Sequence, residues 1–522
     1  MKKAYLLVCT SLLLVACGTT QKSTTAQQSQ TKTTVGPEQY AQTITSEDLK
    51  TALYTYASDE FQGRETGQPG QKKAVNFLKE NYESYGIPAA QDNGDYFQNV
   101  PLNILKLPTV TFSVQDKSFT YVEDFVSASA SKTGKITADQ IVYVAHGIET
   151  DSYSSYGDMD VTDKVVLIKY GEPKKEDGTN VISGTTEMSK WSNPRQEFRA
   201  KREVAMNKGA KAILFYSPQM YPQIAAWFGR DSGSMTLAND MEDSYFFFIN
   251  TNVATTLLSD IEKNDTAEAI DTKITMDFTN NVESLASENV AAFIKGSEKP
   301  EEIIVISAHL DHEGVKDGEV YNGADDDGSG TVAVLEIAEA FSKAVKDGKG
   351  PKRSILFLNV TGEEKGLLGS KYYTDVAPIF PLDQTIANLN IDMIGRTDPN
   401  RKSDNRNYVY LIGSDKLSTE LHEISEAVNK KYTNIELDYT FNDENDPNRF
   451  YYRSDHYNFA KNNIPVIFYF NGTHADYHKP SDTPDKIQYD LLENRARLVF
   501  YTAWELANRD SRIVVDKAME AQ

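Results

Sequence analysis

Short apolar runs alternate with helix-like segments from Val290 onwards, and this alternation constrains the fold more than any other feature of the chain. The apolar runs begin at Ile303, Ser354 and Thr385, and a long apolar helix is expected over 331–346. Runs of this kind separated by helices are typical of a largely parallel sheet with helices on both faces. We therefore predict an α/β fold with a mixed, largely parallel central sheet.

The middle of the chain has a different pattern. Short β-rich runs such as 141–144 and 164–168 are separated there by turn residues. A chain of 522 residues, 39% of them hydrophobic, also has enough apolar material for more than one core. We predict a mainly β domain inserted at 109–280 into a main domain made of 41–108 and 281–510, with a tail at 511–522.

The N-terminus has the pattern of a bacterial export signal. A charged Met-Lys-Lys precedes an apolar run over 4–16, which is too short to span a bilayer. The run ends in Leu-Val-Ala-Cys-Gly, which resembles the bacterial lipobox, where the cysteine is lipidated. We expect a signal peptide at 1–16, then a lipidated Cys17 and a flexible tether up to residue 40, so that an exported protein is anchored to a bacterial membrane. The alternative is an ordinary signal with a buried cysteine.

Charge and cysteine content narrow the possible partners and sources of stability. The formal net charge of −22 argues against a nucleic-acid partner. The only cysteine besides Cys17 is Cys9, which lies inside the expected signal, so no internal disulfide is expected in the exported chain. Stability must then come from the cores and from any bound metal.

A histidine and an aspartate follow the apolar run 303–306. His309 and Asp311 are placed on the same side of an extended segment. His309 can bind a metal while Asp311 orients its ring, because a metal-bound histidine normally gives its other N–H to a carboxylate or carbonyl. His312 is also a possible metal ligand, but it does not have the right spacing. His-x-Asp alone also fits a hydrogen-bonded histidine at a strand end.

Three consecutive aspartates lie in the glycine-rich loop 323–330, just before the expected helix. Three adjacent carboxylates repel one another, and one or two are enough to complement a helix dipole. A bound cation explains the third. A calcium loop needs alternating ligands and a glutamate at its twelfth position, which contiguous Asp325, Asp326 and Asp327 do not supply. Zinc with a bridging carboxylate remains.

Further polar residues follow the later apolar runs. Two adjacent glutamates, Glu363 and Glu364, can divide metal binding and proton transfer between them. Asp392 ends an apolar run, where a carboxylate without a partner is costly. Tyr477 and His478 follow the last run. Reactive groups gather at the carboxyl ends of such strands, so this ordered series predicts one site.

The series resembles the co-catalytic di-zinc aminopeptidases of the clan MH metallopeptidases, the relatives of aminopeptidase Y, glutamate carboxypeptidase II and glutaminyl cyclase. The resemblance covers 46–108 and 280–508, with Asp59–Gly67 and Ser454–His456 as supporting marks. The patches 163–168 and 208–215 resemble a protease-associated domain. The resemblance implies two Zn²⁺ ions bridged by Asp326, with His309 and Asp392 completing one position and Glu364 and His478 the other. It also implies that Glu363 is the general base, that Tyr477 stabilises the oxyanion and that the Asp326–Asp327 peptide is cis.

These expectations predict a zinc-dependent exopeptidase, an aminopeptidase that acts on peptide substrates through a metal-activated water. Three alternatives stay open: a glutaminyl-cyclase-like enzyme with one zinc, a peptidase that removes acidic or C-terminal residues, and a non-catalytic binding protein on the same scaffold. An aminoacylase-like peptidase would carry its extra domain after the glutamate pair, whereas the insert here precedes His309. Side-chain specificity depends on pocket shape and is not predicted.

Overall fold

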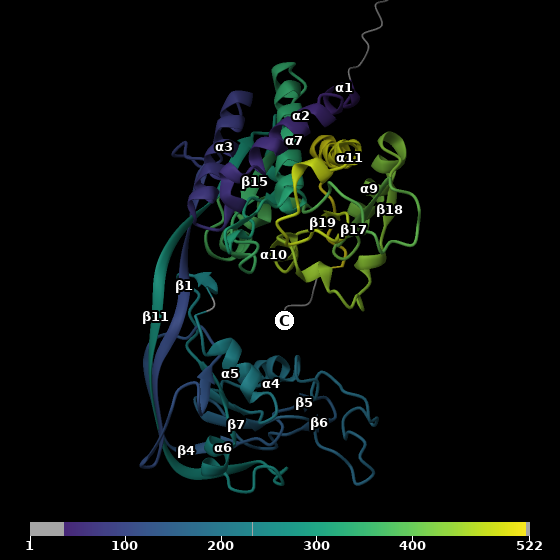
Figure 1. Cartoon of the computed structure of the whole chain (residues 1–522). Helices are drawn as coiled ribbons and strands as arrows, with labels where there is room; N and C mark the ends of the chain where they lie inside the picture. Colours follow the sequence, from purple (N-terminus) through teal and green to yellow (C-terminus); the bar gives the residue numbers. More distant parts are fainter. Residues whose placement is uncertain (1–35, 232, 518–522) are drawn as a thin grey trace, which may run out of the picture. The chain divides into compact units, whose positions relative to one another are not determined.

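The computed structural model describes residues 36–231 and 233–517 (Figure 1). The expected signal peptide, Cys17 and most of the tether therefore lie outside the described residues and stay predictions. Within the described ranges, no helix is both long enough and apolar enough to cross a membrane.

The main domain contains the mixed, largely parallel sheet that the sequence predicts. Its parallel strands are flanked by the antiparallel β11 on one side and β17 on the other. The side chains of β15 and β16 are buried along their whole length, because helices cover both faces. The strands, in their order across the sheet, are β18 (Glu436–Asp438), β17 (Tyr408–Ile412), β19 (Val466–Phe470), β16 (Thr385–Ile391), β12 (Lys299–His309), β15 (Arg353–Val360) and β11 (Glu268–Ile294).

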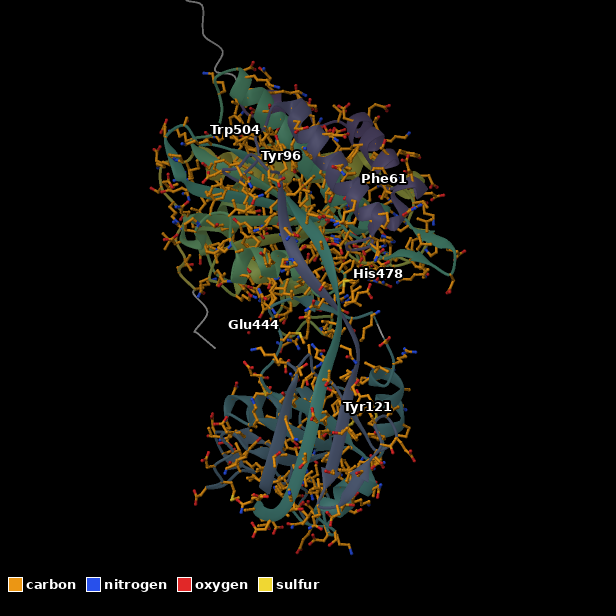
Figure 2. All side chains as sticks on the ribbon, turned by 90° about the vertical axis from the view of Figure 1, so that its left-hand side faces the viewer. Phe61, Tyr96, Tyr121, Glu444, His478 and Trp504 are labelled. Carbon is orange, nitrogen blue, oxygen red and sulfur yellow. The ribbon has the colours of Figure 1, made fainter. Side chains whose placement is uncertain are left out.

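Two cores lie on opposite faces of this sheet, since alternate residues of β12 belong to different cores. The larger core also contains Phe61 and Tyr96, and Trp504 packs against it (Figure 2). The smaller core is covered by α10 (His456–Ala460), whereas Leu368 of α8 (Leu368–Lys371) belongs to a separate small cluster with Val100, Leu102 and Leu237. The helices of the larger core are α1 (Glu38–Ala41), α2 (Ser46–Tyr56), α3 (Pro69–Tyr85), α7 (Gly330–Lys346), α9 (Thr419–Tyr432) and α11 (Tyr489–Asn508).

Two long antiparallel strands lead into the insert. β1 (Phe97–Val114) pairs with β11 from Phe97 opposite Val290 to Val114 opposite Ile274. The predicted insert boundaries at 109 and 280 therefore fall inside paired strands rather than in linkers. Residues 37–522 form one compact unit by their contacts, so the division into two domains stays a prediction.

The central strands of the insert are parallel, and helices join β7 (Val165–Lys169) to β8 (Ala212–Tyr216) and β8 to β10 (Tyr245–Ile249). Parallel neighbours need long crossover connections, and helices usually supply them. Tyr121 packs against its core (Figure 2). A fourth strand, β4 (Gly134–Tyr143), is parallel to β7, and the helices are α4 (Glu197–Asn207), α5 (Tyr221–Phe228) and α6 (Thr251–Leu257).

Short strands complete the sheet and form two hairpins. β3 (Phe125–Ser127) pairs with β10, and β2 (Lys117–Phe119) and β9 (Met235–Leu237) pair with β1. One hairpin joins β5 (Glu149–Thr150) to β6 (Tyr153–Ser154), and the other joins β13 (Gly314–Lys316) to β14 (Glu319–Tyr321). The second hairpin follows β12 and its histidines directly.

Candidate metal centre

The predicted metal ligands meet at one edge of the sheet, where the parallel strands of the main domain end. β12 ends at His309, which pairs with Val360, and Glu364 lies shortly after this residue. Asp392 directly follows β16, and His478 follows β19. The carboxyl ends of parallel strands share an edge, so residues far apart in the sequence become neighbours there. With Asp326 from the acidic loop, the structure brings together all five residues predicted as ligands.

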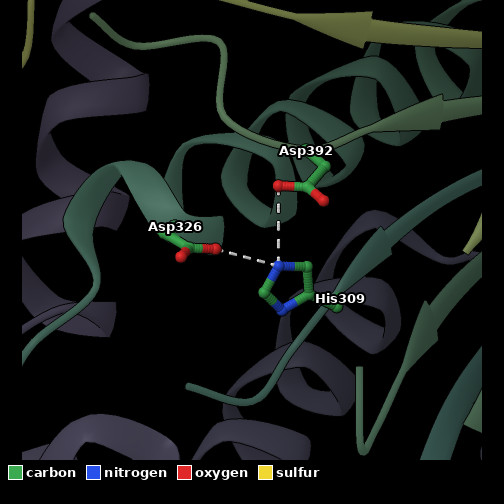
Figure 3. A group of neighbouring side chains, drawn as sticks. All are labelled: His309, Asp326 and Asp392. Carbon is green, nitrogen blue, oxygen red and sulfur yellow. Dashed lines mark ion pairs between the residues drawn. The ribbon is translucent and has the colours of Figure 1, made fainter. Parts of the chain in front are cut away.

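One group of ligand-type atoms lies around His309. Its Nε2 is 3.1 Å from Oδ1 of Asp326 and 3.6 Å from Oδ1 of Asp392 (Figure 3). The Nδ1 atom lies 3.0 Å from the backbone carbonyl oxygen of Asp311, which fixes the ring with Nε2 towards the carboxylates. The His309 side chain is 1% exposed, and its Nε2 has no hydrogen-bond partner. These atoms can hold a cation between them.

Asp311 acts differently from the expectation. Its backbone carbonyl, rather than its carboxylate, contacts His309, because the chain turns away from the strand after this residue. The carboxylate accepts hydrogen bonds from the Thr66 hydroxyl at 2.6 Å and from the backbone N–H of Glu363 at 3.2 Å. Asp311 therefore orients both His309 and the loop that carries Glu363.

A second group lies around His478. Its Nε2 is 3.0 Å from Oδ2 of Asp326 and 3.2 Å from Oε2 of Glu364. Asp326 thus faces His309 with one oxygen and His478 with the other, the arrangement that a bridging carboxylate requires. His478 has a φ of 54°, a left-handed conformation that is uncommon for a residue with a side chain and that concentrates at functional sites.

The acidic loop gives its three aspartates different partners. The Asp325 carboxylate accepts from Ser329 and Gly395, and that of Asp327 accepts from Gly330 and Met393. The Oδ2 atom of Asp326 instead has no hydrogen-bond partner, and the Asp326–Asp327 peptide is cis, as the resemblance implies. Two of the three acids therefore hold the loop, and the middle one is left for a cation.

Sequence reasoning missed several residues around these groups. His312 was set aside for its spacing, yet its Nδ1 lies 2.8 Å from Oε1 of Glu364. Spacing by two applies only within a strand, and β12 ends at His309. Asp482 accepts from the backbone N–H groups of Asp325 and Asp326, at 2.9 and 3.2 Å, and no local signal in the sequence marks that role.

The carboxylates of the site demand positive charge. Burial raises the pKa of Asp326, yet the imidazoles of His309 and His478 hold it well below its usual range. Burial lowers the pKa of His478, but Asp326 and Glu364 more than offset this and raise it to about 10. Burial and Asp326 raise the pKa of Glu364, but His312 and His478 outweigh them and bring it down to about 2. The carboxylates of the site therefore depend on neighbouring positive charge, which a divalent cation would supply.

The donor set fits zinc. Histidine nitrogens and carboxylate oxygens are its usual ligands besides cysteine. Buried polar atoms are normally hydrogen-bonded, so a cluster without partners requires an explanation. The buried atoms without a hydrogen-bond partner at this edge include His309 Nε2, His312 Nδ1, Asp326 Oδ2 and Glu364 Oε1. Cations beside Asp326 would provide these atoms with a partner.

A small pocket with an apolar wall adjoins these groups. Asp326, Glu363, Asp392 and Tyr477 line its polar side. Burial raises the pKa of Glu363 well above its usual range, and Asp392 and Glu364 add to this. Burial and the neighbouring carboxylates also raise the pKa of Tyr477, whose hydroxyl therefore keeps its proton. The remaining lining residues are Met393, Phe450, Arg453, Phe468, Phe470 and Thr473.

The site has two groups of ligand-type histidines and carboxylates at the end of a largely parallel sheet. The resemblance to clan MH metallopeptidases implies this arrangement. Residues 289–503 match the model of Peptidase family M28.

The chain is also similar to individual proteins. A protein of Aspergillus oryzae described as "probable leucine aminopeptidase 2" is 25% identical over 366 residues, which cover 69% of this chain and 61% of that protein. Leupeptin-inactivating enzyme 1 of Streptomyces exfoliatus is 39% identical over 100 residues, 19% of this chain and 21% of that protein. The chain spans 61%, 14% and 14% of the length of the first three curated relatives. An aminopeptidase from Aneurinibacillus sp. strain AM-1 aligns over 92% of this chain and 98% of its own, with 20% identity and a TM-score of 0.48.

Proposed function

We propose that the chain is a zinc-dependent aminopeptidase that removes apolar or aromatic residues from the N-terminus of peptides. The observation that carries this proposal is one pocket in which Glu363 and Tyr477 lie beside two groups of metal ligands that share Asp326. The family of residues 289–503 and the named activities of the relatives support it.

In this proposal His309, Asp392 and Asp326 would hold one zinc ion, and Asp326, Glu364 and His478 would hold the other. Bound zinc would supply a water of lowered pKa and a Lewis acid for the scissile carbonyl. The raised pKa of Glu363 suits a group that takes a proton from the attacking water and returns it to the leaving amine. The Asp311 carboxylate positions Glu363 by accepting a hydrogen bond from the backbone N–H of Glu363. The Tyr477 hydroxyl donates a hydrogen bond to the developing oxyanion.

The pocket wall supports an exopeptidase with a preference for large apolar side chains. Phe450, Phe468 and Phe470 form a cluster whose ring centroids lie 5.0 and 5.3 Å apart in neighbouring pairs. Carboxylates of Asp392 and Glu363 lie at the other side of the same pocket, where a substrate ammonium group would bind. The first side chain would therefore pack on the rings while its amino group faces the acids.

Arg453 supports a second candidate function. Its guanidinium lies over the Phe450 ring at 4.9 Å, lines the pocket and has no ion pair among the described residues. A free guanidinium beside an apolar pocket would bind a carboxylate. A peptidase that prefers an acidic residue, or that recognises a substrate's C-terminal carboxylate, would use this group.

A panel of 4-nitroanilides separates the two candidates. With zinc present, we expect leucine and phenylalanine substrates to be cleaved, N-acetyl-leucine not to be cleaved, and glutamate to be a poor substrate. Cleavage of N-acetylated peptides from their C-terminus, or a preference for glutamate that Arg453→Ala abolishes, would favour the second candidate. Absence of turnover on every substrate with both zinc positions filled would contradict both and favour a binding protein.

We also propose that the protein is exported and anchored to a bacterial membrane by a lipid on Cys17. The apolar run over 4–16 and the small residues around Cys17 support this. Labelling with a fatty-acid analogue during expression should mark the wild-type protein and not Cys17→Ala. Equal labelling of both proteins, or of neither, would contradict the anchor.

A further inference from the structure

We infer that His312 is a fourth protein ligand at the second zinc position, beside Asp326, Glu364 and His478. This inference rests on the metal centre of the proposed function. It gives the second position two imidazoles and two carboxylates, whereas the first has one imidazole and two carboxylates.

The first support is the environment of the His312 ring. The side chain is fully buried, and its Nδ1 lies 2.8 Å from Oε1 of Glu364. Nevertheless the two atoms do not form a hydrogen bond, since both are among the buried atoms without a partner. His309 Nε2, a predicted ligand atom, has the same combination of burial, a short contact to a ligand carboxylate and no hydrogen bond. Atoms arranged in this way direct their lone pairs at a common point rather than at each other.

The second support is the spacing of the candidate ligand atoms. Nδ1 of His312 is 3.8 Å from Oδ2 of Asp326, and this oxygen is 3.0 Å from Nε2 of His478. Two atoms that bind the same zinc ion at about 2.1 Å lie at most about 4.2 Å apart, and these contacts satisfy that limit. The rings of His312 and His478 are inclined at 77° with centroids 5.7 Å apart, so they approach from different directions.

The third support is the packing that fixes the position of the His312 ring. A Cβ on Gly323 would lie 2.4 Å from Cγ of His312, so only glycine allows the ring to lie where it does. Arg64 fixes this position, because its guanidinium donates to the carbonyl oxygens of Asn322 at 2.7 Å and Gly323 at 2.9 Å. The backbone N–H of His312 donates to the Arg64 carbonyl at 3.3 Å. A fully buried imidazole without hydrogen bonds is costly, and a ligand role for Nδ1 would offset part of that cost, while Nε2 stays without a hydrogen-bond partner.

The consequence is that the two positions differ. Structural zinc sites are closed by four protein ligands, whereas catalytic sites keep three and an open position. The second zinc position, with four protein ligands, would be closed. The first, with three protein ligands, would keep one open coordination position. We expect the second position to bind zinc more tightly.

A crystal structure of the wild-type, zinc-loaded full chain at the zinc absorption edge tests the inference without using activity. A zinc–Nδ1 distance of about 2.0–2.1 Å supports it. Zinc at both positions with His312 more than 3 Å away overturns the inference and leaves the proposed function standing. Protein that binds no zinc overturns both. A zinc-bound His312 in a protein without peptidase activity supports the inference and overturns the proposed function.

Zinc retention in graded chelator is the second measurement. Wild-type protein should lose its two ions in separate steps, and His312→Gln should lose the tightly bound ion at chelator concentrations at least a hundred-fold lower. The matched control is His456→Gln, since His456 is also fully buried with both ring nitrogens unpartnered but has no carboxylate in hydrogen-bond contact. Retention like the wild type in His312→Gln, or equal loss in both variants, would overturn the inference. If His312→Gln does not fold, the wild-type crystal structure decides alone.

Discussion

Charged side chains lie at the carboxyl ends of parallel strands in both the main domain and the insert, but their partners differ. In the insert, Lys169 at the end of β7 donates to Asp265 at 2.5 Å, and the buried Lys201 donates to Glu197 at 2.9 Å. In the main domain, His309 Nε2, Asp326 Oδ2 and Glu364 Oε1 have no hydrogen-bond partners. Buried charge alone therefore does not indicate a cofactor. A cluster of several buried ligand-type atoms that the fold leaves unpaired does.

The largest effect that we expect comes from Glu363→Gln. Loss of a general base typically lowers turnover by about a hundred-fold to ten-thousand-fold. Zinc content should stay that of the wild type, because Glu363 is not among the proposed ligands. Steady-state kinetics with a leucine anilide and metal analysis check both points. The control is Glu364→Gln, which should lose zinc and activity together, and undiminished activity of Glu363→Gln would remove the assignment.

Metal removal should affect the stability of the main domain and of the insert differently. A ligand present at a thousand times its Kd stabilises the folded state by about 4 kcal/mol, so chelation should lower the unfolding temperature and zinc should restore it. Hydrogen exchange should show the loss of protection in β12 and β16, whereas β7 and β8 of the insert keep theirs. Equal loss of protection in both regions would break the comparison.

In the insert, the charges of Lys201 and Glu197 should compensate each other without a metal ion. Burial lowers the pKa of Lys201 to about 8, and Glu197 partly offsets this. Lys201→Met should cost about 3–5 kcal/mol in the free energy of unfolding, because it leaves a buried carboxylate without its cation. The double variant Lys201→Met with Glu197→Gln should recover most of that loss. Denaturant unfolding measures both, and an equal loss in the two variants would mean that the charges are not coupled.

Glu336 is a third case, a buried carboxyl on α7 whose Oε2 has no partner at all. Burial raises its pKa to about 8, and Glu339 and Asp48 add to the shift. The folded state therefore binds more protons than the unfolded state between pH 4.5 and 8, and the cost of ionisation grows over this range and is complete above about 8. Glu336→Gln should stabilise the protein by about 2–4 kcal/mol at pH 9 and hardly at pH 5. Unfolding curves that shift equally at both pH values would refute this account.

The sequence predicts the main domain better than the insert for a physical reason. The runs that become β12, β15 and β16 are buried on both faces and read as continuous apolar segments, and their polar ends carry the ligands. In the insert the same kind of parallel strand is present, but α4 has a weakly apolar sequence from which no helix is predicted. The pairing of β1 with β11 also hides the boundary, because both strands continue past it and only a register shift between Lys106 and Thr109 marks it.

The site shows a similar limit. The types and order of its residues identify the five ligand candidates, while the contacts that distinguish neighbours depend on the folded backbone. Asp325 and Asp327 differ from Asp326 only in the N–H groups that reach them. His312 lies beside Glu364 because the chain leaves β12 and packs on Gly323, which spacing in the sequence does not express.

The placement of the ligands on β12, β16 and the loop after β19 has a consequence for how the protein matures. These strands are neighbours in space in the order β19, β16, β12, although long connections separate them along the chain. Non-local parallel pairings form late, since the entropy of closing their loops is lost before the contacts are gained. A half-folded chain can thus offer single histidines to a metal but not the shared carboxylate with both of its groups. Binding of zinc to the complete ligand set would then occur only after folding is complete. Protein purified from cells without zinc would indicate a shortage of zinc rather than a folding defect.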